Sequence, residues 1–204
     1  MNSHGSCMAA VLLAAGSASR FGAAKQTLAI EGVPMVRRAA MTALEADLSP
    51  VVVVTGAYGE AVKSSLVGLP LQLTENPDWA SGMGSSLGLG VRTLMAMKAR
   101  PNALLVLLAD QPGIRAADLK GLVEAHATAP GRIQAARFES HLGPPCLFPK
   151  AYFNELASLQ GPNGARQLLE RHGDRVDGHD LPFAAFNLDT PADHAAWLAH
   201  REIG

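Results

Sequence analysis

Short, wholly apolar runs recur along this chain and alternate with segments that have helical periodicity. Runs such as VVVV and ALLVLL have no polar face, which is typical of strands buried on both sides of a sheet. The strand-like runs, wholly apolar except for the third, occupy Met8–Ala14, Val51–Val54, Leu71–Thr74 and Ala103–Leu108. The helical segments occupy Met35–Ala46, Gly59–Leu66, Ser85–Ala99 and Ala116–Ala127. The alternation predicts a Rossmann-like, three-layer α/β fold in which helices cover a mostly parallel central sheet.

Size and charge narrow the classes of function. The chain has 204 residues, of which 48% are apolar, and a formal net charge of −1, which together fit a single domain over 1–204. No basic stripe points to a nucleic-acid partner, and no apolar run approaches the roughly 20 residues that span a membrane. The N-terminus has no basic region before its first apolar run, so we expect no secretory signal and a cytoplasmic protein.

The texture of the sequence changes after about Pro130, where Gly, Pro and His become frequent. This change predicts three parts within the one domain, over 1–130, 131–182 and a closing part over 183–204. In the closing part we expect a returning strand at Phe183–Leu188. A helix is expected at Pro191–His200, because proline suits the first helical turn.

The loop that follows the first apolar run has the composition of a triphosphate cradle. Glycine and alanine let the backbone approach an anion closely, and successive N–H groups bind phosphate oxygens. Arg20 and Lys25 add fixed positive charge at the end of the loop. The backbone positions that we expect to hold the nucleotide are Leu13, Ala14, Ala15, Gly16 and Ser17. The loop has neither the GK[ST] ending of a Walker A motif nor GxGxxG spacing, so alone it is also compatible with an ordinary connector.

Two aspartates follow predicted strands and are candidate magnesium ligands. Asp110 comes directly after Ala103–Leu108, and Asp189 follows Phe183–Leu188. Mg²⁺ is commonly held by one or two carboxylates while phosphates supply other oxygens. The alternatives are a turn at Asp110 and a helix cap near Asp189, and Asn187 is the fallback ligand. The cysteines and histidines follow no zinc spacing.

A Gly/Ser-rich segment, NPDWASGMGSSLGLGVR, joins a loop to a helix at Asn76–Arg92. Its backbone N–H groups and the hydroxyls of Ser85 and Ser86 could contact a pyrimidine edge or phosphate oxygens at a helix N-terminus. Together with Gly82, these serines are expected to bind the nucleotide. The alternative is a flexible connector capped by serines, and Trp79 and Met83 are interpreted as packing residues.

Four ordered motifs, LAAGSASRFGAAK, NPDWASGMGSSLGLGV, LLADQPG and NLDTPAD, resemble those of nucleotidyltransferases that activate cofactors and sugars. The chain looks most like the molybdenum cofactor cytidylyltransferases and their MobA-like relatives. The later segments GPPCLF and GPNGARQLL resemble the family's acceptor-binding segments, which implies acceptor contacts from Pro145, Asn163 and Arg166. The family's usual GHP is replaced by Gly143, Pro144 and Pro145, so the contact of that histidine is either absent here or supplied by His141. The resemblance makes 1–130 the nucleotide-binding part and 131–182 the acceptor-binding part.

The resemblance implies transfer of CMP from CTP to the phosphate of molybdenum-loaded molybdopterin, with release of pyrophosphate. Asp110 and Asp189 would hold Mg²⁺, Arg20 would hold the β- and γ-phosphates, and Lys25 would neutralise the α-phosphate. Ala15, in LAAG rather than LAGG, favours CTP over GTP. A recipient molybdoenzyme and a monomer are expected. Other readings are guanylyl transfer to molybdopterin, cytidylyl transfer to a sugar or polyol phosphate, and a nucleotide-binding chaperone without catalysis.

Overall fold

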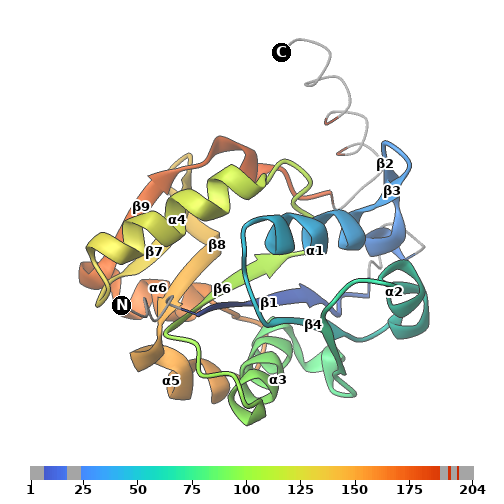
Figure 1. The fold of residues 1–204 in the computed structure, drawn as a ribbon, viewed down its shortest axis with the longest axis horizontal. Helices are drawn as coiled ribbons and strands as arrows, with labels where there is room; N and C mark the ends of the chain where they lie inside the picture. The colour runs from blue at the N-terminus through green and yellow to red at the C-terminus, as the bar shows by residue number, and fades with distance from the viewer. Residues whose placement is uncertain (1–6, 18–23, 189–192, 194–196, 198–204) are drawn as a thin grey trace, which may run out of the picture.

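The computed structural model describes residues 7–17, 24–188, 193 and 197, and its core is one seven-stranded sheet with the strand order β5-β4-β1-β6-β8-β7-β9 (Figure 1). Neighbouring strands pair in parallel except at β8, which is antiparallel to both β6 and β7. The strands of this sheet are β1 (Met8–Ala14), β4 (Val51–Thr55), β5 (Gln72–Glu75), β6 (Ala103–Leu108), β7 (Ile133–Phe138), β8 (His141–Pro149) and β9 (Val176–Asp180). The predicted α/β fold with a mostly parallel sheet is confirmed.

Helices cover both faces of this sheet (Figure 1). On one face lie α1 (Met35–Glu45), α2 (Gly59–Ser65) and α4 (Ala116–Thr128), and on the other lie α3 (Met83–Ala96), α5 (Phe153–Ala157) and α6 (Arg166–Arg171). Alternate residues of β1 serve the two layers: Val11 packs towards α3, whereas Leu12 packs towards α1. All seven residues of β1 are buried, as its continuous apolar run predicts.

Short elements connect these layers. A two-stranded antiparallel sheet, β2 (Ala29–Ile30) with β3 (Val33–Pro34), precedes α1. The 3₁₀ turns are η1 (Lys25–Thr27), η2 (Trp79–Ser81), η3 (Lys150–Tyr152), η4 (Gly173–Arg175) and η5 (Pro182–Ala185). No helix in the described part of the chain is both long and apolar enough to span a membrane.

Helix α3 lies close to the sheet because it carries a glycine at the contact. A Cβ atom at Gly90 would lie 2.6 Å from Val11 Cγ1 and 2.8 Å from Val54 Cγ2. We expect Gly90→Ala to lower the free energy of unfolding by about 1–2 kcal/mol, because overpacking strain of about 1–3 kcal/mol exceeds a helix-propensity gain of up to about 1 kcal/mol. Gly121→Ala in α4 is the matched control, since its Cβ would meet nothing within 4 Å. Urea unfolding should show opposite signs for the two variants, and equal effects would contradict this packing.

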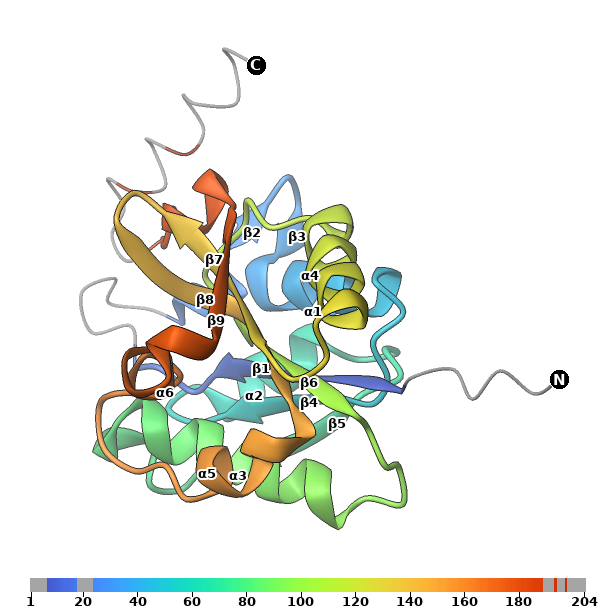
Figure 2. The same ribbon diagram turned by 90° about the vertical axis from the view of Figure 1, so that its left-hand side faces the viewer.

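The segment after about residue 130 extends the same sheet. Figure 2 shows β7, β8 and β9 side by side, and β8 joins them to β6. The thiol of Cys146 is buried in β8, and this burial raises the pKa of the thiol. Residues 131–182 therefore continue the core sheet, and their role in acceptor binding stays a prediction.

The predicted strand at Phe183–Leu188 is wrong, because residues 182–185 form the turn η5. The backbone groups of this segment bond locally: the N–H of Ala184 donates to Leu181 O at 2.9 Å, and the N–H of Phe186 donates to Phe183 O at 3.3 Å. The rings of Phe183 and Phe186 contact Trp197 instead of a sheet face. The helix predicted at Pro191–His200 lies almost wholly outside the described residues.

Histidine 126 in α4 is almost completely buried, with 4% of its surface exposed. Within the described residues its Nδ1 has no hydrogen-bond partner. Burial lowers the pKa of His126, an effect opposed by a backbone hydrogen bond at Arg132. The unfolded chain therefore binds a proton more readily than the folded one, so stability is complete above the unfolded pKa of about 6.5 and is lost as the pH falls through the folded value.

Accordingly, the His126→Gln variant should flatten the fall in unfolding free energy between pH 7.5 and pH 5.5, as measured by urea denaturation at each pH. His141→Gln is the control, because that side chain is exposed. Identical pH slopes for the wild-type protein and His126→Gln would argue against a lowered pKa.

Candidate active site

A cavity of about 400 Å³ lies at the carboxyl ends of β1 and β6, where parallel sheets commonly bind their ligands. It brings together the loop after β1, the loop after β6 and the loop before α3. The described residues that line it are Leu13, Ala14, Ala15, Gly16, Ser17, Lys25, Gln26, Trp79, Ala80, Gly82, Met83, Ser86, Leu108, Ala109, Asp110 and Asn187. The structure therefore places most of the predicted nucleotide-binding residues around a single cavity.

The start of the predicted phosphate loop is held by backbone contacts. The carbonyl of Leu13 accepts a hydrogen bond from Ala109 N at 3.1 Å, and that of Ala15 accepts one from Ala57 N at 3.3 Å. The side-chain Nε2 of Gln26 donates to Gly16 O at 2.7 Å. Gln26 is 2% exposed and was not singled out from the sequence. These bonds fix the backbone that precedes residues 18–23, the undescribed stretch that includes Arg20.

Lys25 and Asp110 meet in this cavity although they are 85 residues apart in the sequence. The Lys25 Nζ donates to Asp110 Oδ2 at 2.6 Å, and the two side chains are only 10% and 20% exposed. Lys25 begins η1, and Asp110 follows the buried strand β6. The backbone carbonyl of Asp110 also accepts a hydrogen bond from Leu188 N at 3.0 Å. Leu188 is therefore tied to the backbone of Asp110.

The second carboxylate oxygen of Asp110 fits a role as metal ligand. Oδ1 is buried and, within the described residues, has no hydrogen-bond partner. An ionised carboxylate oxygen is the donor that Mg²⁺ prefers. Asn187, the fallback ligand, lines the same cavity, whereas Asp189 lies outside the described residues. Since the described part of the chain holds no cluster of three His, Cys, Asp or Glu side chains, the phosphates of a ligand would have to complete the coordination.

The loop before α3 is organised by Asn76, which was not singled out from the sequence. Its buried Nδ2 donates to Ser85 Oγ and to Ser86 Oγ, each at 2.9 Å. The Ser85 hydroxyl in turn donates to Gly82 O at 2.8 Å. Ser85 does not line the cavity, so we place its hydroxyl in the support of the loop, in place of the expected ligand contact. Ser86 does line the cavity.

Trp79 and Met83 both line this cavity, contrary to their interpretation as packing residues alone. Met83 is 44% exposed, and its side chain packs over Gly164, where a Cβ would lie 2.9 Å from Met83 Cγ. Both side chains thus offer apolar surface to a ligand.

The glycines of this segment serve close packing against residues 159–162. A Cβ at Gly82, whose φ is +116°, would lie 2.5 Å from Gly161 O, and one at Gly84 would lie 2.6 Å from Gln160 O. The N–H of Gly84 donates to Gly161 O at 2.8 Å. Hence the first residues of GPNGARQLL support the nucleotide loop.

A second cavity, of about 480 Å³, lies between the β7–β8 hairpin and α6. It is lined by Phe138, Ser140, His141, Leu142, Gly143, Pro144, Arg166, Leu169 and Glu170. Arg166, a predicted acceptor contact, lines this cavity, and its Nε donates to Glu170 Oε1 at 2.8 Å. Pro145 is buried in β8 and Asn163 is exposed, and neither lines this cavity.

Gln111 ties the loop after β6 to β8 and to η5. Its Nε2 donates to Pro144 O at 3.0 Å and to Ala184 O at 2.8 Å. The residue is 5% exposed and follows Asp110 directly, and Pro144, whose carbonyl it binds, lines the second cavity. The only sequence signal for this role is the glutamine inside LLADQPG.

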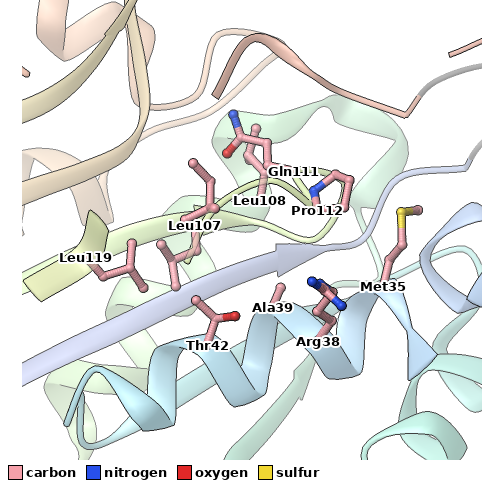
Figure 3. Close-up of a pocket in the computed structure, with 10 residues that line it drawn as sticks. Met35, Arg38, Ala39, Thr42, Leu107, Leu108, Gln111, Pro112 and Leu119 are labelled. Atoms are coloured by element: carbon pink, nitrogen blue, oxygen red, sulfur yellow. The ribbon is translucent and has the colours of Figure 1, made fainter. Parts of the chain in front are cut away.

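The far side of this loop offers no room for a ligand. Figure 3 shows Arg38, Ala39 and Thr42 on α1 facing the end of β6 and the loop that follows it. The cavity between them measures about 20 Å³, which is enough for roughly one water molecule. Helix α1 therefore packs closely against Gln111 and Pro112 on this side of the loop.

The helices behind the second cavity are tied by a charged cluster. Glu155 in α5 binds Arg171, and its Oε2 lies 2.9 Å from His172 Nε2. Burial raises the pKa of Glu155, but the hydrogen bonds with His172 and Arg171 outweigh it and leave the pKa below its ordinary value. This cluster fixes α5 to the end of α6.

Residues 10–176 match the family described as the MobA-like NTP transferase domain. Nicotine blue oxidoreductase of Paenarthrobacter nicotinovorans is 35% identical over 180 residues, which are 84% of this chain and 85% of the relative.

Solved structures share the fold. A nucleotidyl transferase from Methanothermobacter thermautotroptrophicus superposes with a TM-score of 0.79 at 22% identity, over 96% of this chain and 98% of that one. CMP:2-keto-3-deoxy-manno-octonic acid synthetase complexed with CTP gives a TM-score of 0.72 at 16% identity, over 97% and 100% of the two chains. The family match extends over most of the sequence and the 35% identical relative over most of its own length, so the chain belongs to the MobA-like NTP transferase family.

Proposed function

We propose that this protein is a nucleotidyltransferase that moves CMP from CTP to the phosphate of molybdenum-loaded molybdopterin. The observation that carries the proposal is the Lys25–Asp110 pair in the cavity that the phosphate loop lines. The loop that carries Asp110 is also bonded, through Gln111, to Pro144 at a second cavity. This arrangement suits a donor nucleotide and an acceptor that must meet at the α-phosphate.

The acceptor phosphate would attack the α-phosphorus in line. A new bond forms between the acceptor oxygen and the α-phosphorus, and the bond from the α-phosphorus to the bridging oxygen breaks, so that pyrophosphate leaves with that electron pair. A phosphate nucleophile is already ionised, and catalysis therefore depends on positioning and on charge stabilisation. No general base is required.

Within this scheme each residue has a separate task. The backbone of Ala14–Ser17 would bind phosphate oxygens, Arg20 would hold the β- and γ-phosphates, and Lys25 would stabilise charge on the α-phosphate. Asp110 and Asp189, with Asn187 as the fallback, would hold Mg²⁺. The ion, when bound, supplies charge neutralisation for the phosphates. Asp110 would orient it through the oxygen that Lys25 does not bind.

The choice of CTP rests on Ala15 and on the loop before α3. Ala15 lines the cavity and is 7% exposed, and the family resemblance associates LAAG with cytosine. The structurally similar synthetase complexed with CTP offers a precedent for that nucleotide on this fold. Trp79 and Met83 would contact the base.

The choice of acceptor rests on the second cavity. Phe138, Leu142 and Leu169 give it an apolar lining, which suits a fused ring, and Arg166 offers a guanidinium to a phosphate. His141 lines the same cavity and would substitute for the histidine that Pro144 replaces.

The test is incubation with each nucleoside triphosphate, Mg²⁺ and molybdenum-loaded molybdopterin, followed by mass analysis of the products. CTP-dependent formation of the cytosine dinucleotide and pyrophosphate is expected. Product from GTP would overturn the nucleotide assignment, and product only with a sugar or polyol phosphate would overturn the acceptor assignment. Binding without any product would favour a nucleotide-binding chaperone.

A second candidate follows from the relative named nicotine blue oxidoreductase, which is 35% identical to this chain. In that case the chain would act as an oxidoreductase on nicotine blue or a similar compound, and a nicotinamide nucleotide is the electron donor to try. Loss of NADH or NADPH absorbance on addition of nicotine blue, with no pyrophosphate from CTP, would favour this candidate over nucleotidyl transfer.

A further inference from the structure

Lys25 and Asp110 are the only charged side chains among the described residues that line the nucleotide cavity. Their 2.6 Å contact is largely shielded from water, with 10% and 20% of the side chains exposed. By contrast, the surface pair Lys63–Glu60 has exposures of 34% and 90%. Because screening by water weakens exposed pairs, the Lys25–Asp110 attraction is the stronger of the two.

A divalent cation approaching Asp110 therefore meets a carboxylate already neutralised by an ammonium group. One oxygen accepts from Lys25 Nζ, and the other is buried beside it. The arriving ion would sit close to a like charge in a site of reduced dielectric, which is unfavourable. The free energy of metal binding must then include the loss or weakening of the Lys25–Asp110 contact.

A triphosphate changes this balance because it offers Lys25 another anion. The ammonium group sits on a flexible four-carbon stem and carries three donors, so it can exchange one carboxylate oxygen for phosphate oxygens in the same cavity. Once Lys25 contacts phosphate, Asp110 regains its full negative charge for the metal. Since linkage between two ligands is reciprocal, metal and triphosphate must each strengthen the binding of the other.

We infer that Lys25 competes with the divalent cation for Asp110, so that the metal binds well only together with a triphosphate. The inference rests on the proposed function, in which Asp110 is a metal ligand. Lys25 would therefore act before the transfer step as well, because it prevents the metal from occupying the site in the absence of nucleotide.

The test uses Mn²⁺ as the probe and measures its affinity by electron paramagnetic resonance of the free ion. In the absence of nucleotide, Lys25→Met should bind Mn²⁺ about tenfold more tightly than the wild-type protein, within the usual coupling range of about 5- to 150-fold. Lys63→Met is the matched control, because it removes a lysine whose ion pairs lie on the surface. Equal or weaker affinity for the folded Lys25→Met protein would overturn the inference.

A second measurement needs no variant. Addition of a non-hydrolysable CTP analogue, α,β-methylene-CTP, should strengthen Mn²⁺ binding to the wild-type protein by about tenfold. A titration of Mn²⁺ with the analogue alone corrects for chelation in solution, and Mn²⁺ affinity that is independent of the analogue would overturn the inference. Should Lys25→Met not fold, Lys25→Gln takes its place in both measurements. In a folded Lys25→Met protein the gain should be smaller than in the wild-type protein, because only the direct coordination of the ion by phosphate remains, and an equal gain in the two proteins would overturn the inference.

Neither measurement involves an acceptor or turnover, so the inference and the proposed function can fail separately. Coupled binding of Mn²⁺ and analogue without any dinucleotide product would refute the transfer reaction only. Product formation with uncoupled binding would refute only the competition at Asp110.

Discussion

The variant Lys25→Ala is expected to keep its fold and to have a kcat about 10²–10³-fold lower than that of the wild-type protein. This is the usual effect of removing one fixed hydrogen-bond donor to the transition state. Lys25 is the one cationic side chain of the described residues that lines the cavity, so no described neighbour can replace it. The measurement is the rate of pyrophosphate release at saturating CTP.

Lys63→Ala serves as the control for loss of a lysine outside the cavity, and it should turn over at the wild-type rate. Circular dichroism and thermal melts should show native structure for Lys25→Ala, although its midpoint is expected to fall because Asp110 loses a partner in a partly buried site. A folded Lys25→Ala protein with wild-type turnover would remove Lys25 from the mechanism.

The largest effect on binding is expected from Asp110→Asn, which keeps the shape of the side chain and removes its charge. Calorimetry should show loss of Mg²⁺-dependent CTP binding. Among the described residues that line this cavity Asp110 is the one carboxylate, and its Oδ1 has no hydrogen-bond partner within them. Any residual CTP binding should be the same with and without Mg²⁺. The Lys25 charge, then lacking its carboxylate, can still attract phosphate.

Asp47→Asn is the matched control, since Asp47 is an exposed aspartate paired with Lys120. It should bind CTP and Mg²⁺ as the wild-type protein does. Mg²⁺-dependent binding by Asp110→Asn at wild-type affinity would show that another group holds the metal.

The sheet and its helical layers could be predicted because the spacing of apolar residues along the chain indicates which side chains are buried. The strand at 103–108 and the helix at 116–128 follow directly from a continuous apolar run and from 3.6-residue periodicity. The strand predicted at 183–188 was wrong for a physical reason. Its apolar residues pack on Trp197 and its carbonyl at Ala184 binds Gln111, and neither partner is visible in a local window.

The candidate site was predictable where the chemistry is carried by charge. Lys25 and Asp110 were chosen separately from the sequence, and the structure joins them. Asn76, Gln26 and Gln111 were missed because an amide side chain is equally common in loops and on surfaces. Their importance comes from buried hydrogen bonds to distant backbone and hydroxyl groups, which only the tertiary fold reveals.

The contact of Gly82 and Gly84 with residues 160–162 has a consequence for redesign. The stretch that leads into α6 and the second cavity is also the surface on which the nucleotide loop rests. Grafting a relative's residues 159–165 to alter acceptor choice would therefore disturb the donor nucleotide as well, unless the backbone path past the two glycines is kept. A chimera should therefore exchange residues 159–165 together with the loop that contains Gly82 and Gly84.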